Sequence, residues 1–274
     1  MLHNPNREFI FNNFSATSFK LSFFKLEGDS LSMDPSWLER YARQILIPGF
    51  GKEAQVKVKN GSVAIIGLGG LGSIVSIYLT AAGVGELIVV DRDKFQRSDL
   101  NRQILADEKS LGKYKVDVAL SRLRKLNSDV NIMGLKLELS RENINKIGEV
   151  NVVVDCTDNW ETRLLINEYC VSKNIPLVHA GVAGFRGHIT TILPFKSACL
   201  KCIFPHIAET TGRVGVIGAT PALFGALEVL ETIKLLTGIG RPLFNKIMFI
   251  DAKEMQIELI PVRRNKKCPV CGSK

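Results

Sequence analysis

The chain is poor in the residues and segments on which several classes of protein depend. Four histidines in 274 residues leave little provision for histidine-based catalysis, so His179, His188 and His206 are expected to be structural or loop residues. No Lys/Arg-rich run is interleaved with aromatic residues, so nucleic acid is not an expected partner. The N-terminus lacks the basic head, apolar stretch and small-residue cleavage site of a signal peptide, which argues against secretion.

A membrane span is also not expected, although one uncharged run is long enough for it. Residues 63–85 carry no charge, but glycines interrupt the run. β-Branched residues dominate before these glycines and helix formers follow them, which predicts a strand, a turn and a buried helix. The net charge of +9 favours anionic partners such as nucleotide phosphates.

Cysteine is sparse, and its spacing is informative. Six cysteines are too few for a disulfide scaffold, and Cys156 and Cys170 fall in apolar segments where buried thiols are expected. The other four form two CxxC pairs, at the ligand spacing of one structural zinc. A redox role is the alternative, but two pairs flanked by proline and glycine favour Zn²⁺ and a reducing, cytoplasmic compartment. The predicted ligands are Cys199, Cys202, Cys268 and Cys271.

Residues 1–32 differ from the rest of the chain. They are rich in Asn, Ser and Phe without a helical or strand period, and we expect a disordered or misassigned leader. Residues 33–274 are expected to form one domain. The fold class predicted for it is α/β, a Rossmann-like, doubly wound, mainly parallel sheet with antiparallel C-terminal strands and a four-cysteine zinc site. The expected strands are 62–66, 86–91, 131–137, 152–155, 176–179, 187–193, 246–250 and 255–261, and the expected helices are 35–44, 52–59, 71–82, 113–126, 141–147, 161–173 and 221–236.

The sequence GLGGLG follows an expected strand and opens an expected helix. Glycines allow a tight turn and close approach to phosphate, and the helix N-terminus supplies free N–H groups. Asp91 ends the next strand, where it can accept hydrogen bonds from a ribose. These features alone favour a nicotinamide or flavin enzyme. The glycines of the loop are Gly67, Gly69, Gly70 and Gly72.

Polar residues further along the chain shift this prediction towards ATP. Asp93, Arg102 and Lys115 follow strand ends or begin a helix, and Asp158 comes just after a parallel strand. A carboxylate there suits Mg²⁺, which prefers carboxylate and phosphate oxygens. Nucleotidyl transfer from ATP needs such charge neutralisation, whereas hydride transfer does not. Surface salt bridges and helix caps are the alternative explanation of these residues.

The order of these motifs resembles one superfamily. RYARQ, GLGGLG, Asp91-Arg92-Asp93, NRQ, Lys115, DCTDN and two CxxC pairs are similar to the ubiquitin-activating-enzyme-like superfamily, over residues 37–272. Within it, the chain resembles the molybdopterin-synthase and thiamine sulfur-carrier adenylyltransferases (the HesA/MoeB/ThiF family). The resemblance implies an enzyme that uses ATP to adenylate the C-terminal Gly-Gly carboxylate of a small ubiquitin-like sulfur-carrier protein and releases pyrophosphate.

The resemblance also implies roles for individual residues. Gly70 would lie against the phosphates, Asp91 would hold the ribose, Arg102 and Lys115 would contact phosphates and stabilise the transition state, and Asp158 would bind Mg²⁺. In the homodimer that the family forms, Arg43 would reach into the site of the partner subunit and contact ATP there. The cysteines would hold Zn²⁺ away from the chemistry.

The chain departs from many of these relatives in one loop. Residues 204–213 contain no cysteine, and Thr211 stands near the position where relatives carry an acceptor thiol. We therefore expect adenylation only, with a separate sulfur donor. The alternatives are a non-catalytic scaffold subunit, an NAD-dependent oxidoreductase, or adenylation of a peptide or a modified tRNA base. Which carrier is used, and hence which pathway, stays open.

Overall fold

The computed structural model describes residues 35–206 and 214–272, so the expected leader and Thr211 lie outside the described residues. One eight-stranded sheet organises the chain, in the order β3-β2-β1-β4-β5-β6-β7-β8. The first five strands pair in parallel and the last three in antiparallel fashion, which confirms the predicted fold class. The strands are β1 Ser62–Ile66, β2 Glu86–Val90, β3 Asn131–Leu135, β4 Val152–Asp155, β5 Leu177–Ala183, β6 Arg186–Ile192, β7 Lys246–Asp251 and β8 Gln256–Pro261.

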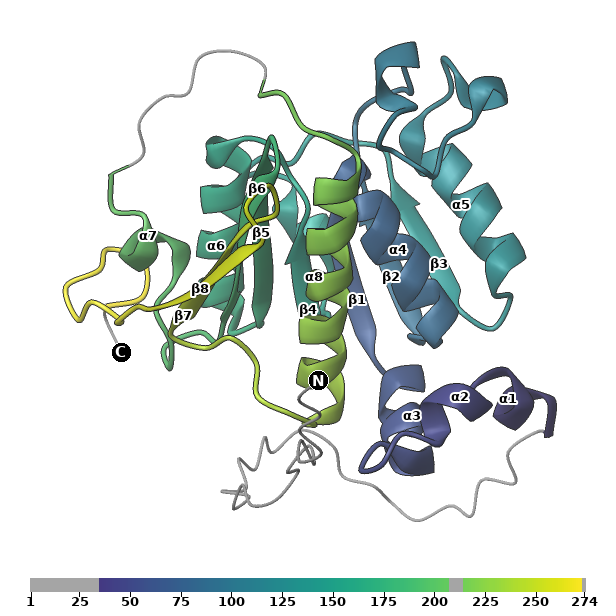
Figure 1. The fold of residues 1–274 in the computed structure, drawn as a ribbon, viewed down its shortest axis with the longest axis horizontal. Helices are drawn as coiled ribbons and strands as arrows, with labels where there is room; N and C mark the ends of the chain where they lie inside the picture. The colour runs from purple at the N-terminus through teal and green to yellow at the C-terminus, as the bar shows by residue number, and fades with distance from the viewer. Residues whose placement is uncertain (1–34, 207–213, 273–274) are drawn as a thin grey trace, which may run out of the picture. The chain divides into compact units, whose positions relative to one another are not determined.

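Helices cover both faces of the sheet (Figure 1). Strand β1 shows why, because Val63 and Ile65 belong to one buried cluster and Ala64 and Ile66 to the other, as the two-residue period of a strand requires. The first cluster packs beneath α4, α5 and α8, and the second beneath α6. The helices are α1 Pro35–Arg40, α2 Ala42–Ile45, α3 Gly51–Lys59, α4 Gly70–Ala82, α5 Lys115–Leu126, α6 Trp160–Lys173, α7 Leu200–Ile203 and α8 Ala219–Thr237.

Two expected helices differ from the structure. The first is interrupted at Tyr41, whose buried hydroxyl accepts a hydrogen bond of 2.7 Å from Asn127 Nδ2. The expected helix at 141–147 is only a 3-10 turn, Ile144–Ile147. There, Asn143 accepts a hydrogen bond from the Ser140 N–H and donates one to the Glu138 carbonyl. These side-chain hydrogen bonds compete with the helical backbone pattern.

Helix α8 lies against the sheet face formed by β4, β5 and β6. Phe224 and Glu228 are fully buried on its inner side, whereas Leu230 is 58% exposed. Burial raises the pKa of Glu228 well above its ordinary value. None of the helices in the described part of the chain combines the length and apolar character that crossing a bilayer needs.

The sheet brings the ends of three parallel strands to one edge. Ile66 pairs with Val90 of β2 and with Asp155 of β4, so the residues that follow these strands emerge side by side. Strand β1 lies between β2 and β4, and the connections run in opposite directions from it. Ligands of open α/β sheets bind at such a switch point.

Candidate functional site

The glycine loop connects β1 to α4 with a backbone that only glycine allows at two positions. Gly67 has φ +93°, and a Cβ there would lie 2.7 Å from the Cys156 carbonyl oxygen. A Cβ on Gly72 would lie 1.8 Å from the Gly67 oxygen. Helix α4 has no side-chain N-cap and no acidic residue in its first turn. Its first N–H groups are therefore suited to an anionic ligand.

Asp91 ties this loop to the end of β2. One carboxylate oxygen accepts a hydrogen bond of 2.7 Å from the Leu68 N–H, and the other accepts one of 2.8 Å from the Asp93 N–H. Burial raises the pKa of Asp91, and the charge of Lys115 opposes that rise. The predicted ribose ligand thus also positions the backbone around the loop.

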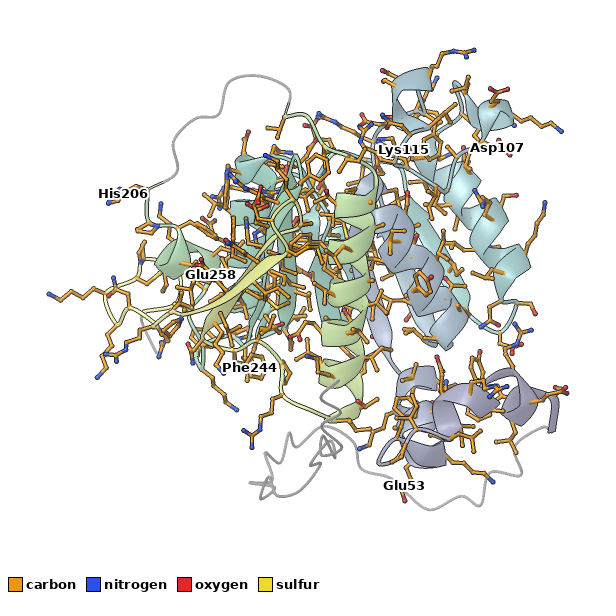
Figure 2. The ribbon with its side chains drawn as sticks, viewed as in Figure 1. Glu53, Asp107, Lys115, His206, Phe244 and Glu258 are labelled. Atoms are coloured by element: carbon orange, nitrogen blue, oxygen red, sulfur yellow. The ribbon has the colours of Figure 1, made fainter. Side chains whose placement is uncertain are left out.

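Two predicted phosphate ligands lie around the same edge. Lys115 Nζ is 3.5 Å from an Asp93 carboxylate oxygen, and the lysine side chain is only 8% exposed. Figure 2 shows Lys115 at the start of α5. The Arg102 guanidinium donates to the Ser98 carbonyl at 2.7 Å and lies 3.3 Å from an Asp99 oxygen. A Cβ on Gly70 would be 3.7 Å from Arg102 Cγ, which puts Arg102 beside the glycine loop.

The predicted magnesium ligand, Asp158, is exposed and follows β4 by three residues. The pKa of the Arg92 guanidinium is raised by its hydrogen bond to Glu138 and by the nearby charges of Asp93 and Asp158. Arg92 also pairs with Asp93 at 3.6 Å. The structure therefore brings Asp158 to the edge where the glycine loop emerges. An exposed carboxylate near the predicted phosphate ligands fits the preference of Mg²⁺ for carboxylate and phosphate oxygens.

Arg43 does not join these residues within one chain. Its neighbour Gln44 donates a hydrogen bond of 3.2 Å to the carbonyl of Ala82, the last residue of α4. The glycine loop lies at the opposite end of that helix, about 20 Å away at 1.5 Å per residue. Figure 2 shows Glu53 of α3 and Lys115 at these opposite ends. Arg43 itself is exposed.

The four predicted zinc ligands lie together, and their Sγ atoms are all within 4.8 Å of one another. The Sγ separations are 3.8 Å for Cys199–Cys202, 3.7 Å for Cys199–Cys268 and 3.4 Å for Cys202–Cys271. A tetrahedron of thiolates with Zn–S bonds of about 2.3 Å has edges of about 3.8 Å. The cluster therefore fits one metal ion. Cys156 and Cys170 are buried apart from it, and burial raises the pKa of both thiols, as expected of inert cysteines.

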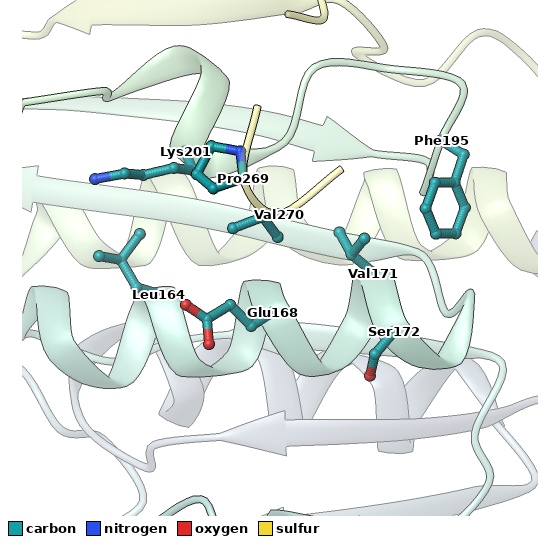
Figure 3. A pocket seen from close by; sticks show the side chains of 8 residues that line it. All are labelled: Leu164, Glu168, Val171, Ser172, Phe195, Lys201, Pro269 and Val270. Carbon is teal, nitrogen blue, oxygen red and sulfur yellow. The ribbon is translucent and has the colours of Figure 1, made fainter. Parts of the chain in front are cut away.

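A cavity of about 570 Å³ lies between α6 and the four-cysteine cluster (Figure 3). Pro269 and Val270, from the second CxxC pair, face residues of α6 across it. None of the predicted nucleotide-site residues lines this cavity. Its lining residues are Leu164, Glu168, Val171, Ser172, Phe195, Lys201, Pro269 and Val270.

A buried polar network that the sequence did not predict lies close to Asp158 along the chain. Asp155 accepts a 2.7 Å hydrogen bond from His179 Nδ1, and His179 Nε2 lies 3.2 Å from His188 Nε2. Asp155 also accepts from the N–H and hydroxyl of Thr157, and Arg163 donates to the Thr157 carbonyl. The motif DCTDN pointed to this segment, but no sequence signal connected Asp155 to a histidine 24 residues away.

Comparison with known proteins identifies the family of the chain. The model of the ThiF family matches residues 41–270. The SAMP-activating enzyme E1 of Haloferax volcanii is 37% identical over 249 residues, covering 89% of this chain and 92% of that protein. The sulfur carrier protein ThiS adenylyltransferase of Escherichia coli is 38% identical over 238 residues, covering 85% of this chain and 94% of that protein.

A solved structure shares the fold. The crystal structure of E. coli MccB with ATP aligns with a TM-score of 0.79 and 28% identity, covering 85% of this chain and 74% of the other. The enzyme class expected from the sequence, an adenylyltransferase, is confirmed by the two named relatives. Because the ThiF family model matches far more than half of the chain, the chain belongs to the ThiF family.

Proposed function

We propose that residues 33–274 act as an ATP-dependent adenylyltransferase for the C-terminal Gly-Gly carboxylate of a small ubiquitin-like sulfur-carrier protein. One observation carries this proposal. The uncapped N-terminus of α4, the side chains of Arg102 and Lys115 and the exposed carboxylate of Asp158 all lie around the carboxyl ends of neighbouring parallel strands. N–H groups, two cationic side chains and a metal-binding carboxylate suit the binding of a polyphosphate rather than of a hydride donor.

The reaction needs no side-chain base. An oxygen of the carrier carboxylate attacks the α-phosphorus of ATP, the bond to the bridging oxygen breaks, and pyrophosphate leaves with the electron pair. The nucleophile is already ionised, so the barrier comes mainly from repulsion between anions. Arg102 and Lys115 reduce it by placing positive charge beside the phosphates, and the first N–H groups of α4 add a fixed dipole.

Asp158 would hold Mg²⁺ in this site. When bound, the ion supplies positive charge to the phosphate oxygens. Arg92 is already engaged by Glu138 and Asp93, which leaves the Asp158 carboxylate exposed for a cation. The four-cysteine cluster would hold Zn²⁺, which pins the C-terminal segment to α7 and takes no part in the reaction.

A homodimer would complete the site. Arg43 is exposed and lies about 20 Å along α4 from the glycine loop, too far to contact ATP in its own subunit. In a homodimer, Arg43 of one subunit would instead reach the nucleotide site of the other subunit. The arginine would then add a second guanidinium to the phosphates bound by the neighbouring chain.

The product would be the free acyl-adenylate, because residues 204–213 contain no cysteine to form a thioester or persulfide. A separate sulfur donor would then attack the adenylate. Metal-binding thiolates need a reducing compartment, which supports a cytoplasmic location.

Two alternatives are weaker. A nicotinamide-dependent oxidoreductase leaves Asp158 and the four cysteines without a role. A non-catalytic scaffold has no use for Arg102, Lys115 and Asp158 together. The named relatives, a SAMP-activating enzyme and a ThiS adenylyltransferase, favour a protein carrier over a tRNA base or a peptide.

Mass spectrometry of the carrier tests the proposal. The chain, ATP and Mg²⁺ are incubated with a Gly-Gly-ended ubiquitin-like protein of the same organism, without a sulfur donor. We expect the carrier to gain the mass of an adenylyl group, which is AMP less one water, and a carrier lacking its last glycine to gain nothing. A mass gain on both carriers, or on neither across all such proteins of the organism, would contradict the proposed substrate.

A further inference from the structure

We propose that His179 is a positioning residue for Asp158. Through Asp155 it fixes the backbone of Thr157 and so sets the position from which the Asp158 carboxylate would bind the magnesium nucleotide. The inference rests on the proposed function, because it takes Asp158 as the ligand of the metal. It assigns a purpose to a buried network that adenylation does not otherwise use.

Both neighbours of Asp158 are held in place. The Thr157 N–H and hydroxyl donate to one Asp155 oxygen at 3.0 and 2.6 Å. The Thr157 carbonyl accepts from Arg163 Nη2 at 2.6 Å and from Nε at 3.2 Å. On the other side, the Asn159 side chain caps α6 by accepting the Thr162 N–H at 2.9 Å. An exposed carboxylate between two fixed neighbours has its Cα position set by them, and only its own rotamer is free.

Asp155 performs this task only if its charge is compensated, because the residue is 0% exposed. Burial raises the pKa of Asp155, but the hydrogen bond from His179, the charges nearby and the Thr157 hydroxyl outweigh burial, so the pKa lies below its ordinary value. Asp155 is therefore ionised. A carboxylate can only accept, so Nδ1 of His179 carries the proton that points at it.

The far side of His179 is closed by a second histidine. Neutral His179 accepts at Nε2, which requires His188 to donate from its own Nε2 across 3.2 Å. His188 has room because Gly181 faces it, where a Cβ would lie 2.5 Å from the His188 ring. Trp160 covers His179, with ring centroids 6.1 Å apart. His179 is thus fixed in tautomer and orientation, as the outer partner of a metal site needs to be.

Two substitutions test the proposal. His179→Leu keeps an apolar side chain of similar bulk and removes the donor to Asp155. Thr157→Val keeps the shape and removes the hydroxyl donor. Binding of Mn²⁺, as a paramagnetic substitute for Mg²⁺, is measured by electron paramagnetic resonance with a non-hydrolysable ATP analogue present. We expect both variants to bind Mn²⁺ about tenfold or more weakly, the loss typical when an outer partner of a metal site is removed.

Two controls separate positioning from general damage. His179→Asn places an amide N–H near the position of Nδ1 and should restore Mn²⁺ affinity. Thr237→Val removes another buried hydroxyl, which donates 2.7 Å to the Ile233 carbonyl at the C-terminal end of α8, outside the network, and should leave Mn²⁺ affinity unchanged. Zinc content and unfolding temperature verify that each variant is folded. If His179→Leu does not fold, the Mn²⁺ affinity of Thr157→Val alone tests the positioning role.

The outcomes distinguish this inference from the proposed function. If Asp158→Ala loses Mn²⁺ binding but folded Thr157→Val and His179→Leu keep it, the positioning role is wrong and the metal ligand stands. An equal loss in Thr237→Val would also overturn the positioning role. If Asp158→Ala itself binds Mn²⁺ like the unmodified chain, the role of Asp158 in the proposed function fails first.

Discussion

Asp158, the proposed ligand of Mg²⁺, contributes little to the stability of the fold. It is exposed, so its removal should change the free energy of unfolding by no more than about 0.5 kcal/mol. Asp158→Ala should nevertheless lower adenylation by about 100-fold or more, since one preorganised charge contributes that much to transition-state stabilisation. Carrier-dependent AMP transfer measures the effect, with zinc content as a check on folding. Retained turnover would exclude Asp158 as the ligand of the metal.

A matched control is Asp129→Ala. This aspartate is also exposed and pairs with Arg40 of α1 at 3.8 Å, and it precedes β3, far from the carboxyl ends of the strands. Its removal should leave adenylation unchanged, within about twofold, because exposed ion pairs contribute little. A comparable loss in this control would mean that the assay responds to net charge rather than to the site.

His188 makes stability depend on pH. Burial, then the neighbouring His179 and Arg163, lower the pKa of His188 to about 3. The unfolded chain protonates this histidine below about pH 6.5, while the folded chain does not, so stability falls as the pH drops from 6.5 towards 3. The slope from one such group is up to about 1.4 kcal/mol per pH unit.

The variant His188→Gln isolates this contribution, because its amide N–H can still donate to His179. Denaturant unfolding at pH 7 and pH 5 should show the unmodified chain losing about 1–2 kcal/mol more than the variant between the two values. An equal loss in both proteins would mean that His188 is protonated in the folded state at pH 5.

At the scale of elements, the four-cysteine cluster joins α7 to the segment after β8. Cys268→Ser should lose the metal and lower the free energy of unfolding by several kcal/mol. At about 2–4 °C per kcal/mol, the unfolding temperature should drop by roughly 10 °C. Differential scanning calorimetry with metal analysis checks this. Cys170→Ala, which removes a buried thiol outside the cluster, should retain one zinc per chain. Loss of zinc in this variant too would contradict the assignment of the four clustered cysteines as the zinc ligands.

Most elements could be predicted from local patterns, because strand periods and glycine positions are local. Alternation along Ser62–Ile66 and the loop Gly67–Gly72 needed only adjacent residues. The helix expected at 141–147 failed because Asn143 binds its neighbours through its side chain, a competition that periodicity does not record. Helix α7, four residues long, was too short to give a period.

The site residues also divide into those that local motifs predict and those that depend on contacts between distant segments. Motifs found the glycine loop, Asp91, Lys115 and Asp158, since each stands at a recognisable place relative to a strand end. They did not find His179, because its role depends on the cross-strand pairing of Asp155 with His179 between β4 and β5. The scarcity of histidine favours structural roles for these residues, but it does not predict that two of the four lie within hydrogen-bond distance of each other.

At the scale of the whole molecule, the position of Arg43 leads to a complementation test. Arg43→Ala and Asp158→Ala should each inactivate a homodimer. In a heterodimer of the two variants, one site keeps both Asp158 and the partner's Arg43, while the other lacks both. Heterodimers purified with two tags should show about half of the unmodified activity, as two-fold symmetry requires. No recovery in verified heterodimers would contradict a site shared between subunits.

The central claim is activation of a Gly-Gly carboxylate by ATP, and carrier-dependent ATP–pyrophosphate exchange tests it most directly. Exchange requires both substrates in one site and a reversible acyl-adenylate, and it needs no sulfur donor. With a panel of Gly-Gly-ended ubiquitin-like proteins from the same organism, we predict exchange with one carrier and its loss when that carrier lacks the last glycine. Absence of exchange across the complete panel, with ATP binding, zinc and the dimer verified, would contradict the account.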